Sequence, residues 1–273
     1  SVAASVRILF SVAPQAPDDH KYLQAKKARV GDLRVVPDDA SQLPADSGIL
    51  IGRDWRESKE LRDANPDKLV FTAGDLLLSA HDINGEIRSV QSIQENGMKR
   101  FVNGGVKTDM FHVVGGLGLE ALAAAPAIVV GEGYATADTL SQSLGYATVA
   151  AFDSGNLPHV AKKLREHFPN KVMIIAGDND AHLELTEGTN CGKTKALEAA
   201  HAVGGSTLIP VFAPGEQLYP AGLEPVTPEK IKAGELSDDQ KAAINRMKGY
   251  TDFNDLATKS AFGMEGVNRQ VRE

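Results

Sequence analysis

The chain has 273 residues, a hydrophobic content of 42% and a formal net charge of −7. This length suffices for one large domain or two smaller ones, and the acidic balance argues against a protein that coats nucleic acid non-specifically. Every apolar run is shorter than the ~20 residues that span a bilayer, and the single cysteine, Cys191, excludes an internal disulfide and a cysteine zinc cluster. We therefore expect a cytoplasmic protein that does not engage a membrane.

The first third of the chain contains few clear elements. Residues 20–27 have the composition of a short basic helix, and residues 41–47 have that of a loop. Gly48–Ile51 and Leu69–Phe71 are short runs with β-branched or aromatic residues, which favour strands. Because the chain begins with Ser1 rather than Met, we expect it to be a fragment or a processed chain.

Residues 76–114 have the pattern of antiparallel hairpins. Asn84-Gly85 and Asn96-Gly97 are strong signals for tight turns, because both residue types tolerate a positive φ angle. The turns separate three predicted strands, and a fourth follows them: Leu76–Ala80, Ile87–Ile93, Lys99–Val102 and Phe111–Val114. We expect these strands to form a small antiparallel meander.

After a junction at residues 115–126, the pattern changes to alternating strands and helices. The predicted strands are Ala127–Val130, Thr148–Ala151, Val172–Ala176 and Thr207–Pro210, and the predicted helices are Thr136–Ser143, Pro158–His167 and Lys193–Val203. This alternation is typical of a parallel sheet with helices on its faces. Residues 215–250 are rich in proline and charge and predict a surface insertion with a polar helix at 237–247, followed by a closing helix at 253–260. We therefore predict two units, residues 1–120 and residues 121–273.

Acidic residues follow two of the predicted strands. Glu132 lies between two glycines after the strand at 127–130, and Asp178 and Asp180 follow the strand at 172–176. Ligands bind at the carboxyl ends of parallel strands, and hard oxygen donors suit Mg²⁺ or Mn²⁺. The alternative is that Glu132 is an exposed turn residue and that the aspartates only cap the next helix.

The segment Gly188–Thr194 contains Gly192-Lys193-Thr194, which is the end of a phosphate-binding P-loop motif. Glu187 occupies the position at which that motif needs its first glycine. We interpret the segment as the start of a helix, with Lys193 available to a phosphate.

A glutamate after the first strand and an Asp-x-Asp after a later one resemble the Toprim domain of primases, topoisomerases and related nucleases. Three further segments resemble motifs of plasmid-type primases: His20-Lys21-Tyr22-Leu23, Lys99-Arg100-Phe101 and Asp252-Phe253-Asn254-Asp255. The resemblance covers residues 20–255, with gaps between the motifs. It implies an α/β fold, in which a Rossmann-like parallel sheet with helices on both faces follows a smaller mixed α+β subdomain with an antiparallel sheet.

The resemblance further implies a DNA primase of conjugative plasmids and mobile elements, a nucleotidyltransferase that makes RNA primers from ribonucleoside triphosphates on single-stranded DNA. Glu132, Asp178 and Asp180 would be the catalytic and metal-binding residues, with Mg²⁺ or Mn²⁺ as cofactor. A helicase or relaxase region, in this or another chain, would be a partner. The alternatives are a Toprim nuclease and a non-catalytic nucleic-acid-binding module of a larger conjugation protein.

Basic residues on and beside the predicted hairpins are the candidates for binding phosphates of the nucleotide or the template: Lys99, Arg100, Lys107 and Arg88. The alternative for each is a solvated strand face. In the last motif, Asp252 is a good helix cap, whereas the resemblance places Asp252, Asn254 and Asp255 near the metal site as accessory residues.

Overall fold

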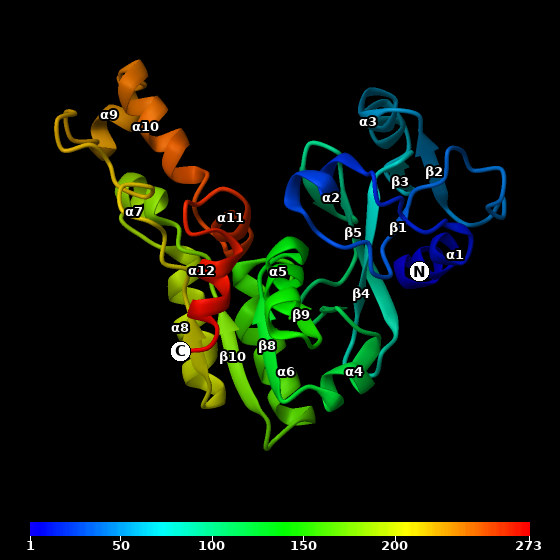
Figure 1. Ribbon diagram of the computed structural model, residues 1–273. Coiled ribbons are helices and arrows are strands. Elements are labelled where there is room, and N and C mark those ends of the chain that lie inside the picture. The colour runs from blue at the N-terminus through cyan, green and yellow to red at the C-terminus, as the bar shows by residue number, and fades with distance from the viewer.

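The computed structural model describes every residue from Ser1 to Glu273. Figure 1 shows an N-terminal part, in blue to cyan, beside a C-terminal part in green to red. The N-terminal elements are α1 (Val2–Val12), α2 (Lys21–Lys26), β1 (Arg34–Val35), β2 (Ile49–Gly52), α3 (Trp55–Ala64), β3 (Leu69–Thr72), β4 (Leu76–His81), β5 (Ile87–Ile93) and β6 (Lys99–Phe101). No helix in the chain is both long and apolar enough to cross a membrane.

The N-terminal part contains the predicted antiparallel sheet. Its strand order is β1-β4-β5-β6, with antiparallel pairing throughout, and β2 and β3 form a separate parallel pair beside α3. Gly85 and Gly97 have φ angles of 83° and 88°. The two Asn-Gly turns therefore form as predicted, because glycine adopts positive φ without a steric penalty.

The remaining elements belong to the C-terminal part. They are β7 (His112–Val114), α4 (Gly118–Ala124), β8 (Ala127–Gly131), α5 (Tyr134–Leu144), β9 (Thr148–Ala150), the 3₁₀ helix η1 (Ser154–Asn156), α6 (Leu157–His167), β10 (Val172–Ala176), α7 (Ala181–Glu187), α8 (Cys191–Val203), β11 (Ser206–Leu208), α9 (Pro228–Ala233), α10 (Asp238–Lys248), α11 (Phe253–Thr258) and α12 (Gly263–Gln270). Strands β11, β10, β8 and β9 are parallel neighbours in that order, and β7 pairs with β9 in the antiparallel direction. The predicted α/β fold class is confirmed.

One strand lies in a different sheet from the one expected. The segment 111–114 was predicted as the fourth strand of the meander, but β7 is the edge strand of the parallel sheet. All three of its residues are buried, so the strand needs cover on both faces. The parallel sheet supplies that cover, because helices pack on both of its sides. The boundary at residue 120 stays a prediction, and the C-terminal sheet begins eight residues before it.

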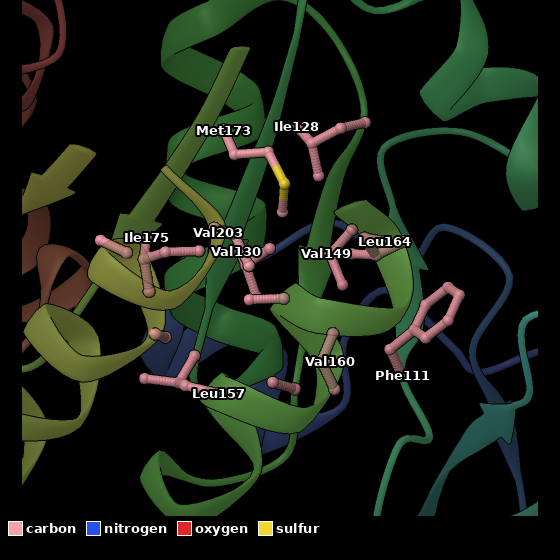
Figure 2. Close-up of a cluster of buried hydrophobic side chains, with 14 of the residues drawn as sticks. Phe111, Ile128, Val130, Val149, Leu157, Val160, Leu164, Met173, Ile175 and Val203 are labelled. Carbon is pink, nitrogen blue, oxygen red and sulfur yellow. The ribbon is translucent and has the colours of Figure 1, made fainter. Parts of the chain in front are cut away.

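Alternating side chains of the central strands build a core on each face of the parallel sheet. On one face, residues such as Ile128, Val130 and Ile175 pack against α6 and α8, as Figure 2 shows. On the other face, Ala127 and Val129 pack with α5, α11 and α12. Alternation thus determines which side chains of a strand enter each core. The polar residues of the site lie beyond the cores, in the turns that follow the carboxyl ends of the strands.

The insertion at residues 215–250 lies at the surface, as predicted. Its helices α9 and α10 pack against α7 at the far end of the C-terminal part, in orange in Figure 1. A capping box formed by Ser237 and Gln240 begins α10, which accounts for the predicted polar helix. The helices α1, α3, α4, α7, α9 and α12 were not predicted.

Candidate active site

The turns after β8 and β10 bring Glu132 and Asp178 together. The two strands are parallel neighbours, with Val130 opposite Ile175, so their carboxyl ends reach the same edge of the sheet. There the backbone N–H of Asp178 donates a hydrogen bond of 2.8 Å to Oε2 of Glu132. A Cβ atom at Gly177 would lie 2.5 Å from Cβ of Ala196. The glycine therefore permits α8 to pack directly against this turn.

Asp180 lies in the same turn but is also bound to a helix end. Its Oδ2 accepts a hydrogen bond of 2.9 Å from the backbone N–H of Gly192, in the first turn of α8. Its own N–H donates to Oδ1 of Asn190, the cap of that helix. The helix-capping alternative thus holds for one oxygen of Asp180, while its charge still acts on Glu132 and Asp178.

The acidic residues perturb one another strongly. Burial, followed by the charges of Glu132 and Asp252, raises the pKa of the Asp178 carboxyl well above its usual value. Burial and the charges of Asp180 and Asp252 raise the pKa of Glu132 as well, against the hydrogen bond from Asp178. Oδ1 of Asp178 is buried without a hydrogen-bond partner. A cation at this oxygen would relieve both the repulsion and the missing contact.

The donors in this turn fit a hard divalent cation. All are carboxylate oxygens, the class that Mg²⁺ and Mn²⁺ prefer. No group of three or more His, Cys, Asp or Glu side chains is gathered into a complete metal cage. Glu132 and Asp180 each accept one backbone N–H as well. Mg²⁺ is usually held by only one or two carboxylates together with waters and substrate phosphates. The pair Glu132 and Asp178 matches that ligand set.

Cations face the acidic pair across a cavity of about 170 Å³. The residues that line it come from α2, β6, the start of α5 and the turns after β8, β9, β10 and α10: Tyr22, Lys26, Lys99, Glu132, Gly133, Ala135, Thr136, Phe152, Asp153, Asp178 and Asp252. A Cβ atom at Gly133 would lie 3.0 Å from Nζ of Lys99, so the glycine leaves room for this ammonium beside Glu132. Burial lowers the pKa of Lys99, because it disfavours the charged ammonium, although the negative charge of Asp252 acts in the opposite direction.

The other predicted cations lie in different places. Arg100 is next to Lys99 on β6 and therefore points to the opposite face. There it lines a separate small cavity with Arg62 and Lys68. Lys107 forms an ion pair with Asp153 at the rim of the acidic cavity. Arg88 lies on β5 with its Nε 3.9 Å from Asp82, roughly 16 Å along the strand from the residue that pairs with Lys99.

Asp252 both caps a helix and lies in the acidic cavity, so the two alternatives for this residue hold together. Oδ1 of Asp252 accepts the N–H of Asp255 at 2.7 Å and so caps α11, while the same side chain lines the acidic cavity. The Asn254 amide donates to the Lys26 carbonyl and to Thr139 Oγ1, which ties α11 to α2 and α5. Asp255 accepts from Thr251 and pairs with Lys259 at 3.0 Å. Only Asp252 of this motif faces the cavity.

The sequence did not predict six of the cavity residues as part of the site: Tyr22, Lys26, Ala135, Thr136, Phe152 and Asp153. Tyr22 and Lys26 are four residues apart on α2 and share one face of that helix. The resemblance at His20–Leu23 was the available signal for α2. Phe152 has a φ angle of 76°, a strained backbone conformation that sequence does not reveal. Lys193 is exposed on α8 and does not line the cavity.

The chain was compared with protein families and with individual proteins. No family model matches it. Two proteins of Escherichia coli, each named DNA primase TraC, are 48% and 47% identical to it. The first match covers 71% of this chain and 21% of the relative, and the second covers 95% of this chain and 19% of the relative. The chain thus spans about a fifth of the length of these relatives.

Solved structures give more distant likenesses. A DNA primase domain from Pseudomonas aeruginosa has a TM-score of 0.48 and 16% identity, and the match covers 92% of this chain and 79% of that one. A DnaG primase catalytic domain bound to single-stranded DNA also has a TM-score of 0.48, with 14% identity over 92% of this chain and 79% of that one.

Proposed function

The chain belongs to the family of plasmid-type DNA primases, of which it matches one segment, and from this premise we propose that it is a primase catalytic core. It synthesises short RNA primers from ribonucleoside triphosphates on a single-stranded DNA template. The observation that carries the proposal is the cavity in which Glu132 and Asp178 face Lys99 and Lys26. Carboxylates opposite ammonium groups form a site for a metal-bound triphosphate.

The acidic side of the cavity holds the cofactor. Glu132 and Asp178, with the charge of Asp180 beside them, would bind Mg²⁺ or Mn²⁺. The bound cation would neutralise the negative charge that develops on the phosphoryl oxygens during the transfer. Glu132 has a raised pKa and lies at the edge of this site, so it accepts the proton of the attacking 3′-hydroxyl.

The basic side of the cavity holds the substrate. Lys99 and Lys26 contact the triphosphate and orient its pyrophosphate as the leaving group. Positioning of this kind is most of what phosphoryl transfer needs from a protein. Lys107 is already paired with Asp153, and so its contribution to a phosphate requires exchange of that partner.

The template backbone follows a different surface. Arg100, Arg62 and Lys68 line one cavity and form no ion pair within the chain. They bind template phosphates on the far side of β6, with Arg88 as a further contact on β5. In plasmid conjugation, a helicase or relaxase region of the same or another chain would supply the single strand.

A ribonucleotide-incorporation assay on single-stranded DNA tests the function. The purified chain is incubated with labelled ribonucleoside triphosphates, Mg²⁺ or Mn²⁺ and the template, with D178N as the matched inactive control. We expect short RNA products that need the template and are absent with D178N. Shortening of the template without RNA products would instead establish a nuclease. Binding of the template without either reaction would identify a non-catalytic module.

A further inference from the structure

Tyr22 presents an unused hydroxyl group to the catalytic cavity. The residue is only 2% exposed and lines the cavity together with Asp252. Its hydroxyl is buried and has no hydrogen-bond partner in the protein. The ring packs in a hydrophobic core cluster with Leu23 and Leu33. Close packing of this kind limits the movement of the side chain.

An unpartnered hydroxyl of this kind is costly. A buried polar group without a hydrogen bond destabilises a protein, because it loses its hydrogen bonds to water and gains none in return. Phenylalanine would fill the same volume without that cost. Burial, and then the charge of Asp252, raise the pKa of Tyr22, so the phenol stays neutral and keeps its proton. It can donate one hydrogen bond to a ligand in the cavity.

Asp252 supplies the complementary acceptor. Its Oδ1 accepts the N–H of Asp255, whereas its Oδ2 accepts no hydrogen bond. A donor and an acceptor thus line the same cavity, and the charge of Asp252 acts on Tyr22. An alcohol is the chemical group that both accepts one hydrogen bond and donates another. An ionised phosphate oxygen only accepts hydrogen bonds and has no proton to donate to Asp252.

We propose that Tyr22 and Asp252 recognise the 2′-hydroxyl of the incoming ribonucleotide and make the enzyme select ribonucleotides over deoxyribonucleotides. The phenol donates to the sugar oxygen, and the sugar hydroxyl donates to Oδ2 of Asp252. A deoxyribonucleotide leaves both protein groups without a partner, and sites built to bind a substrate hydroxyl reject such analogues. This inference rests on the proposed primase function.

The test is the substitution Y22F, which removes only the oxygen. The kcat/KM values for ribonucleotide and deoxyribonucleotide incorporation are measured on the same template. We expect kcat/KM for ribonucleotides to fall about tenfold, as for the loss of one good hydrogen bond, and that for deoxyribonucleotides to stay unchanged. The melting temperature should be unchanged or higher, because the lost group had no partner in the free protein.

The matched control is Y146F, which removes a tyrosine hydroxyl outside the cavity and should leave both kcat/KM values unchanged. An unchanged ribonucleotide preference in Y22F, or an equal loss for both sugars, would overturn the inference while leaving the primase function intact. If the wild-type chain makes no primers, the primase function itself fails. Competition between ATP and dATP for binding then decides the role of Tyr22: equal ATP preference in wild type and Y22F would overturn it.

Discussion

A hydrogen bond from the backbone N–H of Asp178 to the Glu132 carboxylate keeps the two residues adjacent, although their side-chain charges repel each other. The cost of this arrangement appears in the raised pKa values of both carboxyls. Asp252 adds a third charge, and its position is fixed because it also caps α11. The carboxylates of the site therefore repel one another, and a bound cation would reduce this repulsion.

Removal of one carboxylate should separate stability from activity. The variant D178N keeps the size of the side chain and lowers the repulsion, so its melting temperature should match or exceed that of the wild type. Primer synthesis should fall by at least about 100-fold, because charge stabilisation by the metal is lost. Incorporation assays and thermal denaturation measure the two effects. Near-normal primer synthesis would remove Asp178 from the site.

Glu132 should contribute more to proton transfer from the 3′-hydroxyl than to the affinity for the metal. In E132Q, the amide oxygen can still accept the N–H of Asp178, so the turn stays in place. We expect affinity for Mn²⁺ to remain within about tenfold, or roughly 1.4 kcal/mol, while primer synthesis collapses. Calorimetric titration with Mn²⁺ measures the metal affinity of E132Q, and the incorporation assay measures its primer synthesis. If E132Q loses metal binding to the same degree as D178N, Glu132 is a plain metal ligand.

Asp75 gives a prediction on pH that is independent of catalysis. Burial, and then the charge of Glu95, raise its pKa to about 6, well above its usual value. The folded state therefore binds this proton more tightly than the unfolded state does, and stability is lost as pH rises through about 6. The variant D75N should gain melting temperature over the wild type between pH 4 and pH 7. The exposed Asp63, whose pKa the Lys59 hydrogen bond lowers, serves as the control, and a gain of equal size in D63N would contradict the assignment.

Among the elements, the edge strand β6 separates two kinds of cation. Lys99 faces the acidic cavity and Arg100 faces the cavity with Arg62 and Lys68, because successive residues of a strand point to opposite sides. In the proposed function, this one strand would contact the nucleotide on one face and the template on the other.

This separation predicts distinct effects of two changes at β6. K99A should reduce primer synthesis strongly and leave the salt dependence of single-stranded DNA binding nearly unchanged. The double variant R62A/R100A should reduce the slope of log affinity against log salt by about 1.4, since each phosphate contact on a single strand contributes roughly 0.7. Binding titrations at several salt concentrations measure the slope. Equal slopes for R62A/R100A and the wild type would show that these arginines are only solvated.

At the scale of the whole molecule, His112 joins the two parts of the chain. It lies on β7 of the parallel sheet, yet its Nε2 is 3.1 Å from Asp32 and its Nδ1 is 2.9 Å from the Ser79 carbonyl, both in the N-terminal part. The side chain is 2% exposed. The acidic cavity is also built from both parts of the chain, so both features depend on how the two parts pack together.

Loss of this junction should weaken the whole fold. H112A removes contacts to both parts and leaves a cavity, so we expect the free energy of unfolding to fall by about 2–4 kcal/mol. Urea denaturation measures the change. The matched control is H159A, because His159 is largely exposed and lies 3.7 Å from Asp109; its effect should stay within about 0.5 kcal/mol. An equally small effect of H112A would mean that His112 does not join the two parts.

The sequence by itself determined the elements and the acidic end of the sheet. Alternating apolar runs and Asn-Gly turns are local signals, so β5 and β10 begin and end at the predicted residues. Glu132 and Asp178 directly follow strands, and the carboxyl ends of neighbouring parallel strands necessarily share one edge. The parallel sheet therefore places both residues at one edge, while their direct contact requires that β10 pair with β8.

Only the tertiary structure decided which residues complete the site. Tyr22 and Lys26 are more than 100 residues away from Glu132 in the chain, and α2 reaches the cavity through packing that no local pattern encodes. In the same way, β7 joins the parallel sheet because both of its faces need cover. Strand alternation predicts that Lys99 and Arg100 point in opposite directions, but only the packed structure decides that Lys99 is the one that lines the acidic cavity. Local propensity fixes where a strand begins and ends, whereas long-range packing fixes which neighbours its side chains contact.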